Sequence, residues 1–160
     1  MSNGGFFSMA LACQRADRFA GVAAVGSTQS ADLSCEPSRH LPVLLIAGTE
    51  DPLVPYEGGE VASDRGTALS AADTIEGWRT RQGCEEAPTT TDWPDAVDDG
   101  TTVHEERSCA DTAEEVRLLE VRGGGHTWPG GSQYLPRFVI GRVSEELDAS
   151  EEIVEWFLDR

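Results

Sequence analysis

The sequence predicts an α/β fold in which helices flank a mostly parallel sheet, and three observations lead to this class. Apolar residues make up 39% of the 160-residue chain, which is enough for one packed core at this length. A continuous apolar run at 42–47 stops at Gly48, as expected of a central strand that is buried on both faces. Segments with helical spacing alternate with such strands, a pattern that is typical of sheets with helical crossovers.

The same periodicities place the elements in order along the chain. Helices are expected where apolar residues recur at helical spacing: from 6 to between 14 and 17, over 67–82 and over 149–159. Strands are expected over 21–25, 42–47, 101–105 and 115–121. Gly83 stands where a glycine ends a helix, and Ser150 is expected to cap the last helix. The acidic stretch 85–100 predicts a solvated loop. No internal repeat or linker divides the chain, which predicts a single domain over 1–160.

The charge balance excludes several classes of partner. The chain has 29 acidic and 12 basic residues, all of the latter arginine, and its formal net charge is −17. Such a surface repels nucleic-acid phosphates and anionic lipid, so neither is expected to bind. No apolar run approaches the roughly 18 to 20 residues that span a bilayer, which excludes a transmembrane segment. No signal peptide is visible at the start.

Three short segments carry residues suited to catalysis. Ser2-Asn-Gly-Gly5 completes half of a G-x-S-x-G nucleophile elbow, in which a sharp turn before a helix exposes a serine hydroxyl; the alternative is an ordinary glycine-rich segment. Asp51 follows the central strand, where open α/β sheets place catalytic groups, although a turn or N-cap aspartate is the alternative. His126 lies in the glycine-rich run Gly123–Gly131, which offers little apolar surface for packing a histidine.

The three candidates occur in the order Ser2, Asp51, His126, each at a predicted strand end. This is the chain order of the α/β-hydrolase triad and differs from the orders of chymotrypsin-like and subtilisin-like enzymes. The other histidines, His40 and His104, lie in segments where a structural or solvated role is expected.

On these residues the sequence resembles the esterase and poly(3-hydroxybutyrate) depolymerase family, which includes feruloyl and acetylxylan esterases. The matching segments are Met1–Gly5, Gly48-Thr-x-Asp-Pro-x-Val-Pro-Tyr-x-Gly-Gly59, Gly123-Gly-Gly-His-Thr-Trp-Pro-Gly-Gly131 and Leu147–Ser150 before the last helix. The resemblance implies an α/β-hydrolase fold and a secreted serine esterase that needs no cofactor.

The resemblance also implies a role for each residue. Ser2 corresponds to the nucleophile, His126 to the general base and Asp51 to the residue that orients the histidine. The backbone N–H of Asn3 would be one oxyanion donor. Trp128 is expected either to form an acyl or aryl binding wall or to pack over the glycine-rich loop.

The chain departs from the family at its start. The strand that feeds the elbow and the first half of the sheet, with its second oxyanion donor, have no counterpart in this sequence. We therefore expect a partial catalytic domain that begins at the nucleophile elbow, corresponds to the C-terminal half of the fold and has the N-terminal half as its missing partner. An exposed sheet edge is expected where those strands would pair.

Four cysteines allow three disulfide pairings, or four reduced thiols. Cys13–Cys35 and Cys84–Cys109 close the shortest loops and agree with the pairing that the resemblance implies. Oxidised cysteines would favour an extracellular location. No Cys/His spacing suggests zinc, and the aspartates of 92–99 lack the EF-hand order, so no metal site is expected.

The expected function is that of a serine carboxylester hydrolase. It would act through an acyl-enzyme on polyesters such as polyhydroxybutyrate, or on feruloyl or acetyl esters of the plant cell wall. The alternatives are an oligopeptidase-type serine peptidase, an inactive truncated remnant and an acidic binding module.

Overall fold

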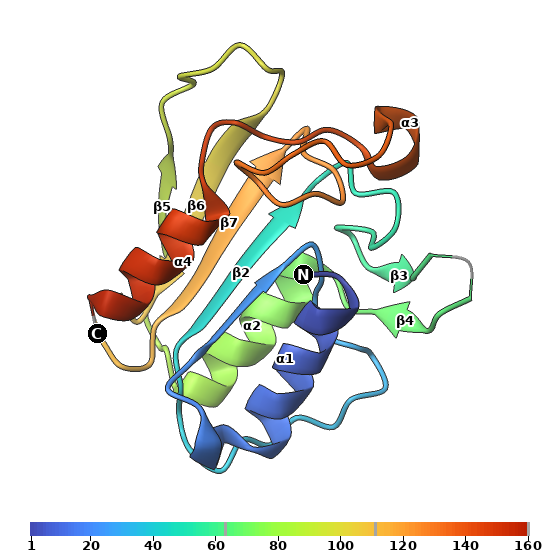
Figure 1. Cartoon of the computed structure of the whole chain (residues 1–160). Helices are drawn as coiled ribbons and strands as arrows, with labels where there is room; N and C mark the ends of the chain where they lie inside the picture. The colour runs from blue at the N-terminus through green and yellow to red at the C-terminus, as the bar shows by residue number, and fades with distance from the viewer. Residues whose placement is uncertain (63, 111, 160) are drawn as a thin grey trace.

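A computed structural model describes residues 1–62, 64–110 and 112–159, and its elements form three layers (Figure 1). The five-stranded sheet has the order β1-β2-β7-β6-β5. Its strands are β1 (Val22–Val25), β2 (Val43–Gly48), β5 (Thr89–Asp92), β6 (Thr102–Ser108) and β7 (Val116–Arg122). The helices are α1 (Asn3–Gln14), α2 (Ala71–Gln82), α3 (Arg137–Ile140) and α4 (Ala149–Leu158), with a short 3-10 turn η1 (Ala16–Arg18). A separate hairpin joins β3 (Gly59–Glu60) and β4 (Thr67–Ala68).

The α/β class with flanking helices is confirmed, but the sheet is mixed rather than mostly parallel. Strands β1, β2 and β7 run parallel, whereas β6 and β5 are antiparallel to their neighbours. The reason lies in the connections. Among the described residues, no helix separates β5 from β6 or β6 from β7. Without a helical crossover, a chain returns to the sheet antiparallel.

The core occupies both faces of the sheet, and β2 is buried along its whole length. On one face, Leu45 belongs to a cluster with Trp78 of α2 and with side chains of α1. On the other face, Ile46 belongs to a cluster with Trp156 of α4. Successive residues of β2 therefore pack alternately into two cores, as expected of a strand that lies between two helical layers. Figure 1 shows α1 and α2 together over one face.

Helix α2 begins later than expected, and α4 begins where expected but has a different N-cap. Helix α2 starts at Ala71 rather than at 67, because Ser70 Oγ accepts the Asp73 N–H at 2.9 Å as an N-cap. Thr67 and Ala68 instead pair with β3. Helix α4 is capped by Asp148, whose carboxylate accepts the Ser150 N–H at 2.7 Å. The expectation that Ser150 itself is the cap was wrong.

The end of α2 agrees with the sequence pattern. Gly83 has a φ of 72° and donates its N–H to the last turn of the helix, a conformation in which glycine carries no penalty.

Strand β5 was not expected, because 85–100 was predicted to be a solvated loop. All four β5 residues are exposed, so the segment lacks the apolar alternation that marks a half-buried strand. It forms by pairing with β6, with Thr89 opposite Arg107 and Asp92 opposite His104. Threonine suits such a pleated, exposed position because of its branched Cβ.

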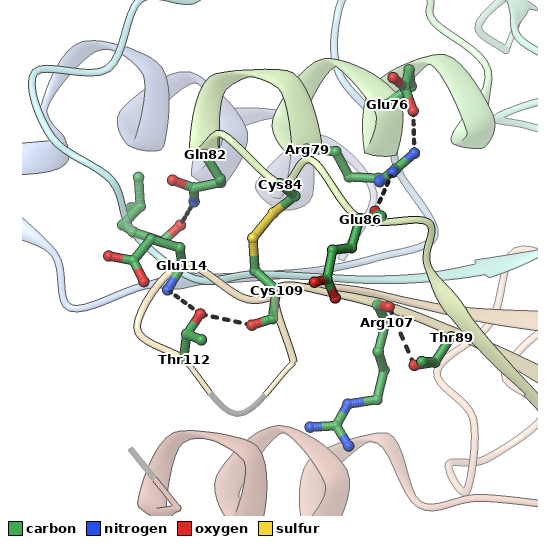
Figure 2. The surroundings of a disulfide bond; sticks show 11 residues. Glu76, Arg79, Gln82, Cys84, Glu86, Thr89, Arg107, Cys109, Thr112 and Glu114 are labelled. Carbon is green, nitrogen blue, oxygen red and sulfur yellow. Dashed lines mark hydrogen bonds and ion pairs between the residues drawn. A yellow bond between two sulfur atoms is a disulfide. The ribbon is translucent and has the colours of Figure 1, made fainter.

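The four cysteines form two disulfides, in the pairing that the resemblance implied. Cys13 bonds Cys35 and links the end of α1 to the loop before β2. Cys84 bonds Cys109 and links the end of α2 to the end of β6 (Figure 2). In Figure 2, Arg79 of α2 reaches Glu76 on its own helix and the backbone of Glu86 beyond the disulfide. The second bridge thus ties a helix to the antiparallel part of the sheet.

Strand β1 forms one edge of the sheet and pairs with β2 alone in the described part of the chain. A groove of about 330 Å³ lies beside it, lined mainly by apolar side chains of α1, β1 and α4. No helix in the described residues is long and apolar enough to cross a membrane.

Candidate active site

Ser2 lies in a sharp turn immediately before α1. Its φ of 53° and ψ of −129° are unusual for a residue with a side chain and store local strain. Its backbone N–H donates to the Val25 carbonyl at 3.0 Å, which places the turn at the carboxyl end of β1. A strained serine in a sharp turn before a helix resembles the local geometry of a nucleophile elbow.

Asp51 and His126 form a buried hydrogen-bonded pair. Asp51 Oδ2 accepts a hydrogen bond from His126 Nδ1 at 2.7 Å, and the two side chains are 2% and 4% exposed. Asp51 Oδ1 accepts the N–H groups of Leu53 and Val54, each at 2.8 Å. Because a carboxylate only accepts, Nδ1 carries the proton and leaves Nε2 as the acceptor. The imidazole is therefore in the tautomer that a general base requires.

The loop that carries His126 is tied down by its backbone. The His126 N–H donates to the Ile140 carbonyl at 2.6 Å, and the Tyr134 hydroxyl donates to the His126 carbonyl at 2.9 Å. Burial, together with the charge of Asp51, raises the pKa of Tyr134, so the hydroxyl stays protonated as a donor. Sequence reasoning missed Tyr134, since nothing in the local pattern links it to a backbone eight residues away.

The position of Gly26 shows how Ser2 lies relative to the Asp51–His126 pair. It follows Val25, the residue that binds the Ser2 backbone, and has a φ of 55°. A Cβ on Gly26 would lie 3.5 Å from His126 Nδ1 and 3.8 Å from Asp51 Oδ2. Ser2 and His126 thus lie against consecutive residues at the end of β1. No hydrogen bond joins their side chains among the described residues; catalytic hydrogen bonds are often long before substrate binds.

A pocket of about 410 Å³ opens beside Ser2, within the size range of small-molecule sites. The start of α1, the residues that bind Asp51 and the hairpin of β3 and β4 form its walls. Its lining residues are Ser2, Asn3, Phe6, Ser30, Leu53, Val54, Val61, Ala62, Arg65, Gly66 and Thr67. Leu53 and Val54 connect this pocket directly to the Asp51–His126 pair.

Asn3 also lines the pocket beside Ser2. Its backbone N–H is the first of α1, so no carbonyl of the helix lies in position to accept it. Such an amide is suited to bind an oxyanion.

Trp128 lies elsewhere. It lines the groove beside β1 with Phe157 of α4 and donates its indole N–H to Ser150 Oγ at 3.1 Å. It contributes nothing to the lining of the Ser2 pocket, so its position favours the packing alternative over a binding wall.

The remaining candidates lie outside the site. His40 is exposed, and His104 pairs with Asp92 on the exposed strand β5 at 2.7 Å. Within the described residues, no group of three His, Cys, Asp or Glu side chains could hold a metal ion.

The comparisons with known proteins agree with a hydrolytic site. No family model matches the chain. A curated protein named "Putative esterase NocK", from Nocardia uniformis subsp. tsuyamanensis, is 33% identical over 98% of this chain and 49% of its own length. This chain is similar to esterases. "Feruloyl esterase B" from Piromyces equi is 29% identical over 78% of this chain and 23% of its own length. The chain therefore spans half or less of the length of these relatives.

Proposed function

We propose that this chain carries the catalytic triad of a serine carboxylester hydrolase, with Ser2 as nucleophile, His126 as general base and Asp51 as its orienting partner. The observation that carries the proposal is the buried Asp51–His126 hydrogen bond at the end of β1, where the strained turn of Ser2 also lies. In this proposal, three residues that are widely separated in sequence act together to activate a serine hydroxyl.

The mechanism follows from these positions. His126 Nε2 takes the Ser2 proton as Oγ attacks the ester carbonyl, and the resulting imidazolium is stabilised by the Asp51 carboxylate. The same proton then goes to the leaving alcohol, which yields an acyl-enzyme. Water, deprotonated by His126, releases the acid and restores Ser2.

The Asn3 N–H binds the oxyanion of each tetrahedral intermediate. A single oxyanion donor contributes about 2.7 to 4 kcal/mol to transition-state stabilisation. A second donor would come from a segment beyond the described residues, in line with the greater length of the relatives.

The α/β-hydrolase fold is part of the proposal. In it, β1, β2 and β7 are parallel strands of a larger sheet that continues past β1. The apolar groove beside β1 supports this, and so does Phe7, which is 64% exposed on α1. An N-terminal half of the same fold would cover both and supply the missing strands.

The substrate class remains the one expected from the resemblance, a polyester such as polyhydroxybutyrate or a feruloyl or acetyl ester. The likeness to a protein named a feruloyl esterase favours the second group. Two disulfides are typical of proteins from oxidising compartments, which supports secretion.

A turnover panel tests the function. We expect release of p-nitrophenol from short p-nitrophenyl esters, and hydrolysis of methyl ferulate or hydroxybutyrate oligomers, with no cleavage of a peptide amide. All turnover should be lost in Ser2→Ala and kept in Ser8→Ala, since Ser8 lies within α1 and does not line the pocket. Cleavage of the amide in preference to the esters would identify a peptidase, and a folded chain without any turnover would identify an inactive remnant or binding module.

A further inference from the structure

The pocket beside Ser2 has an unusual charge for this protein. In a chain with 29 acidic residues among 160, none of the pocket's lining residues is acidic. The one charged side chain in the lining is Arg65, which comes from the turn between β3 and β4. The pocket is thus a locally cationic site on a protein of formal charge −17.

No interaction with a described residue explains the presence of a charged side chain at Arg65. Its backbone N–H donates to the Val61 carbonyl at 3.0 Å, but its guanidinium forms no ion pair or hydrogen bond with any described residue. The acidic neighbours in the same turn are Glu60 and Asp64. Glu60 Oε1 instead accepts the Asp64 N–H at 2.7 Å, and neither residue lines the pocket.

The rest of the pocket suits the carbon skeleton of a small acid. Phe6, Leu53, Val54 and Val61 provide apolar walls in the same pocket as Ser2 and Arg65. A ligand that reaches from the Ser2 hydroxyl across these walls would meet the guanidinium. Arginine offers a planar pair of donors that matches a carboxylate.

We propose that the substrate of this site is an ester that bears a free carboxylate, and that Arg65 binds this carboxylate while Ser2 attacks the ester carbonyl. This inference rests on the proposed function and names its substrate class. The surrounding negative charge repels anions. The preference for a carboxylate ester over a neutral ester therefore depends on Arg65, and it weakens as salt screens the charge of the guanidinium.

Two matched pairs of esters test the proposal, one for each side of the ester bond. On the acyl side, the p-nitrophenyl monoester of adipic acid is compared with its neutral methyl ester. On the alcohol side, 4-carboxyphenyl butyrate is compared with its methyl ester. Each pair differs in charge at one position, and kcat/KM is measured for every ester with the wild type, Arg65→Gln, Arg65→Lys and Arg18→Gln.

We expect Arg65→Gln to lower kcat/KM by about tenfold for the carboxylate member of one pair. This fold-change corresponds to the lower end of the free energy of a hydrogen bond to a charged group, which we use because Arg65 is exposed. The neutral member should change by less than about twofold, and Arg65→Lys should keep part of the preference. Arg18→Gln removes the same charge from an exposed side chain at the far end of α1 and should change neither member.

Equal effects of Arg65→Gln on both members of both pairs would overturn the carboxylate proposal and leave the esterase function standing. A wild-type chain that is folded but hydrolyses none of the four esters would overturn the function, and this inference with it.

Discussion

Asp51 uses both of its carboxylate oxygens, one for His126 and one for its own loop. The N–H groups of Leu53 and Val54 hold Oδ1, so Oδ2 points at Nδ1 of the imidazole. An amide in this position would present its NH₂ group to one of these donors. Asp51 therefore controls both the orientation and the tautomer of His126.

At this position we expect Asp51→Asn to lower ester turnover by about 10⁴-fold, because the wrong imidazole tautomer cannot accept the Ser2 proton. The measurement is kcat for a short p-nitrophenyl ester. Asp92→Asn is the matched control, since Asp92 also pairs with a histidine, His104, but on the exposed strand β5. Equal losses in the two variants would contradict the role given to Asp51.

Individual residues were predictable where one short segment carries the chemistry. Asp51 after a buried strand and His126 among glycines could be recognised from their neighbours. Gly26 and Tyr134 could not, because their importance arises from contacts with segments far along the chain or with a backbone atom. The two roles of Trp128 stayed open, since proximity in sequence to His126 does not determine which side of the loop the indole faces.

Among the elements, those with a strong apolar pattern were predicted and those without one were not. Strand β2 and helix α4 bury apolar side chains at regular spacing and lie close to their expected ranges. Strand β5 and the hairpin of β3 and β4 depend on pairing with a partner rather than on burial. The mixed sheet could have been anticipated from the lack of a helix between the last two expected strands.

The connection between β5 and β6 is held to the segment before α4 by Asp99. Its Oδ1 accepts from the backbone and hydroxyl of Thr101, and its Oδ2 accepts the Glu145 N–H at 2.6 Å. Burial acts to raise the pKa of Asp99, but these hydrogen bonds and Arg142 outweigh it, and the net shift is downward.

A group whose pKa is lower in the folded state stabilises the fold above its unfolded pKa, about 3.9 for aspartate, and loses that effect as pH falls through the folded value. We expect Asp99→Asn to lower Tm at pH 7 and the gap to the wild type to close near pH 2. Thermal unfolding at both pH values measures this. Asp98→Asn, next to it and exposed, should leave Tm unchanged; a gap that is independent of pH would count against the carboxylate.

The two disulfides close loops of similar length, with sequence separations of 22 and 25. On the chain-entropy estimate each stabilises the fold by roughly 3 kcal/mol. The double variants Cys13→Ser/Cys35→Ser and Cys84→Ser/Cys109→Ser should therefore lose similar free energies of unfolding in urea. Free thiol in the unreduced, denatured wild type would show that the bonds do not form.

For the molecule as a whole, the proposed catalytic residues lie at one end of the parallel strands, and β1 pairs with β2 alone in the described part of the chain. Figure 1 shows the start of α1 and the carboxyl ends of β2 and β7 at the same end of the sheet. The apolar groove lies beside the edge strand β1, where the proposed N-terminal half of the fold would add its strands. The formal charge of −17 disfavours anionic macromolecules as partners, and it does not determine the chemistry of the site.

The central claim is that Ser2 is an activated nucleophile. The most direct measurement is reaction with an alkyl fluorophosphonate, followed by intact mass and peptide mapping. We expect one adduct per chain, on the peptide that contains Ser2, and we expect it to be lost in Ser2→Ala and kept in Ser8→Ala. A folded chain that stays unlabelled, or an adduct on any other residue, would contradict it.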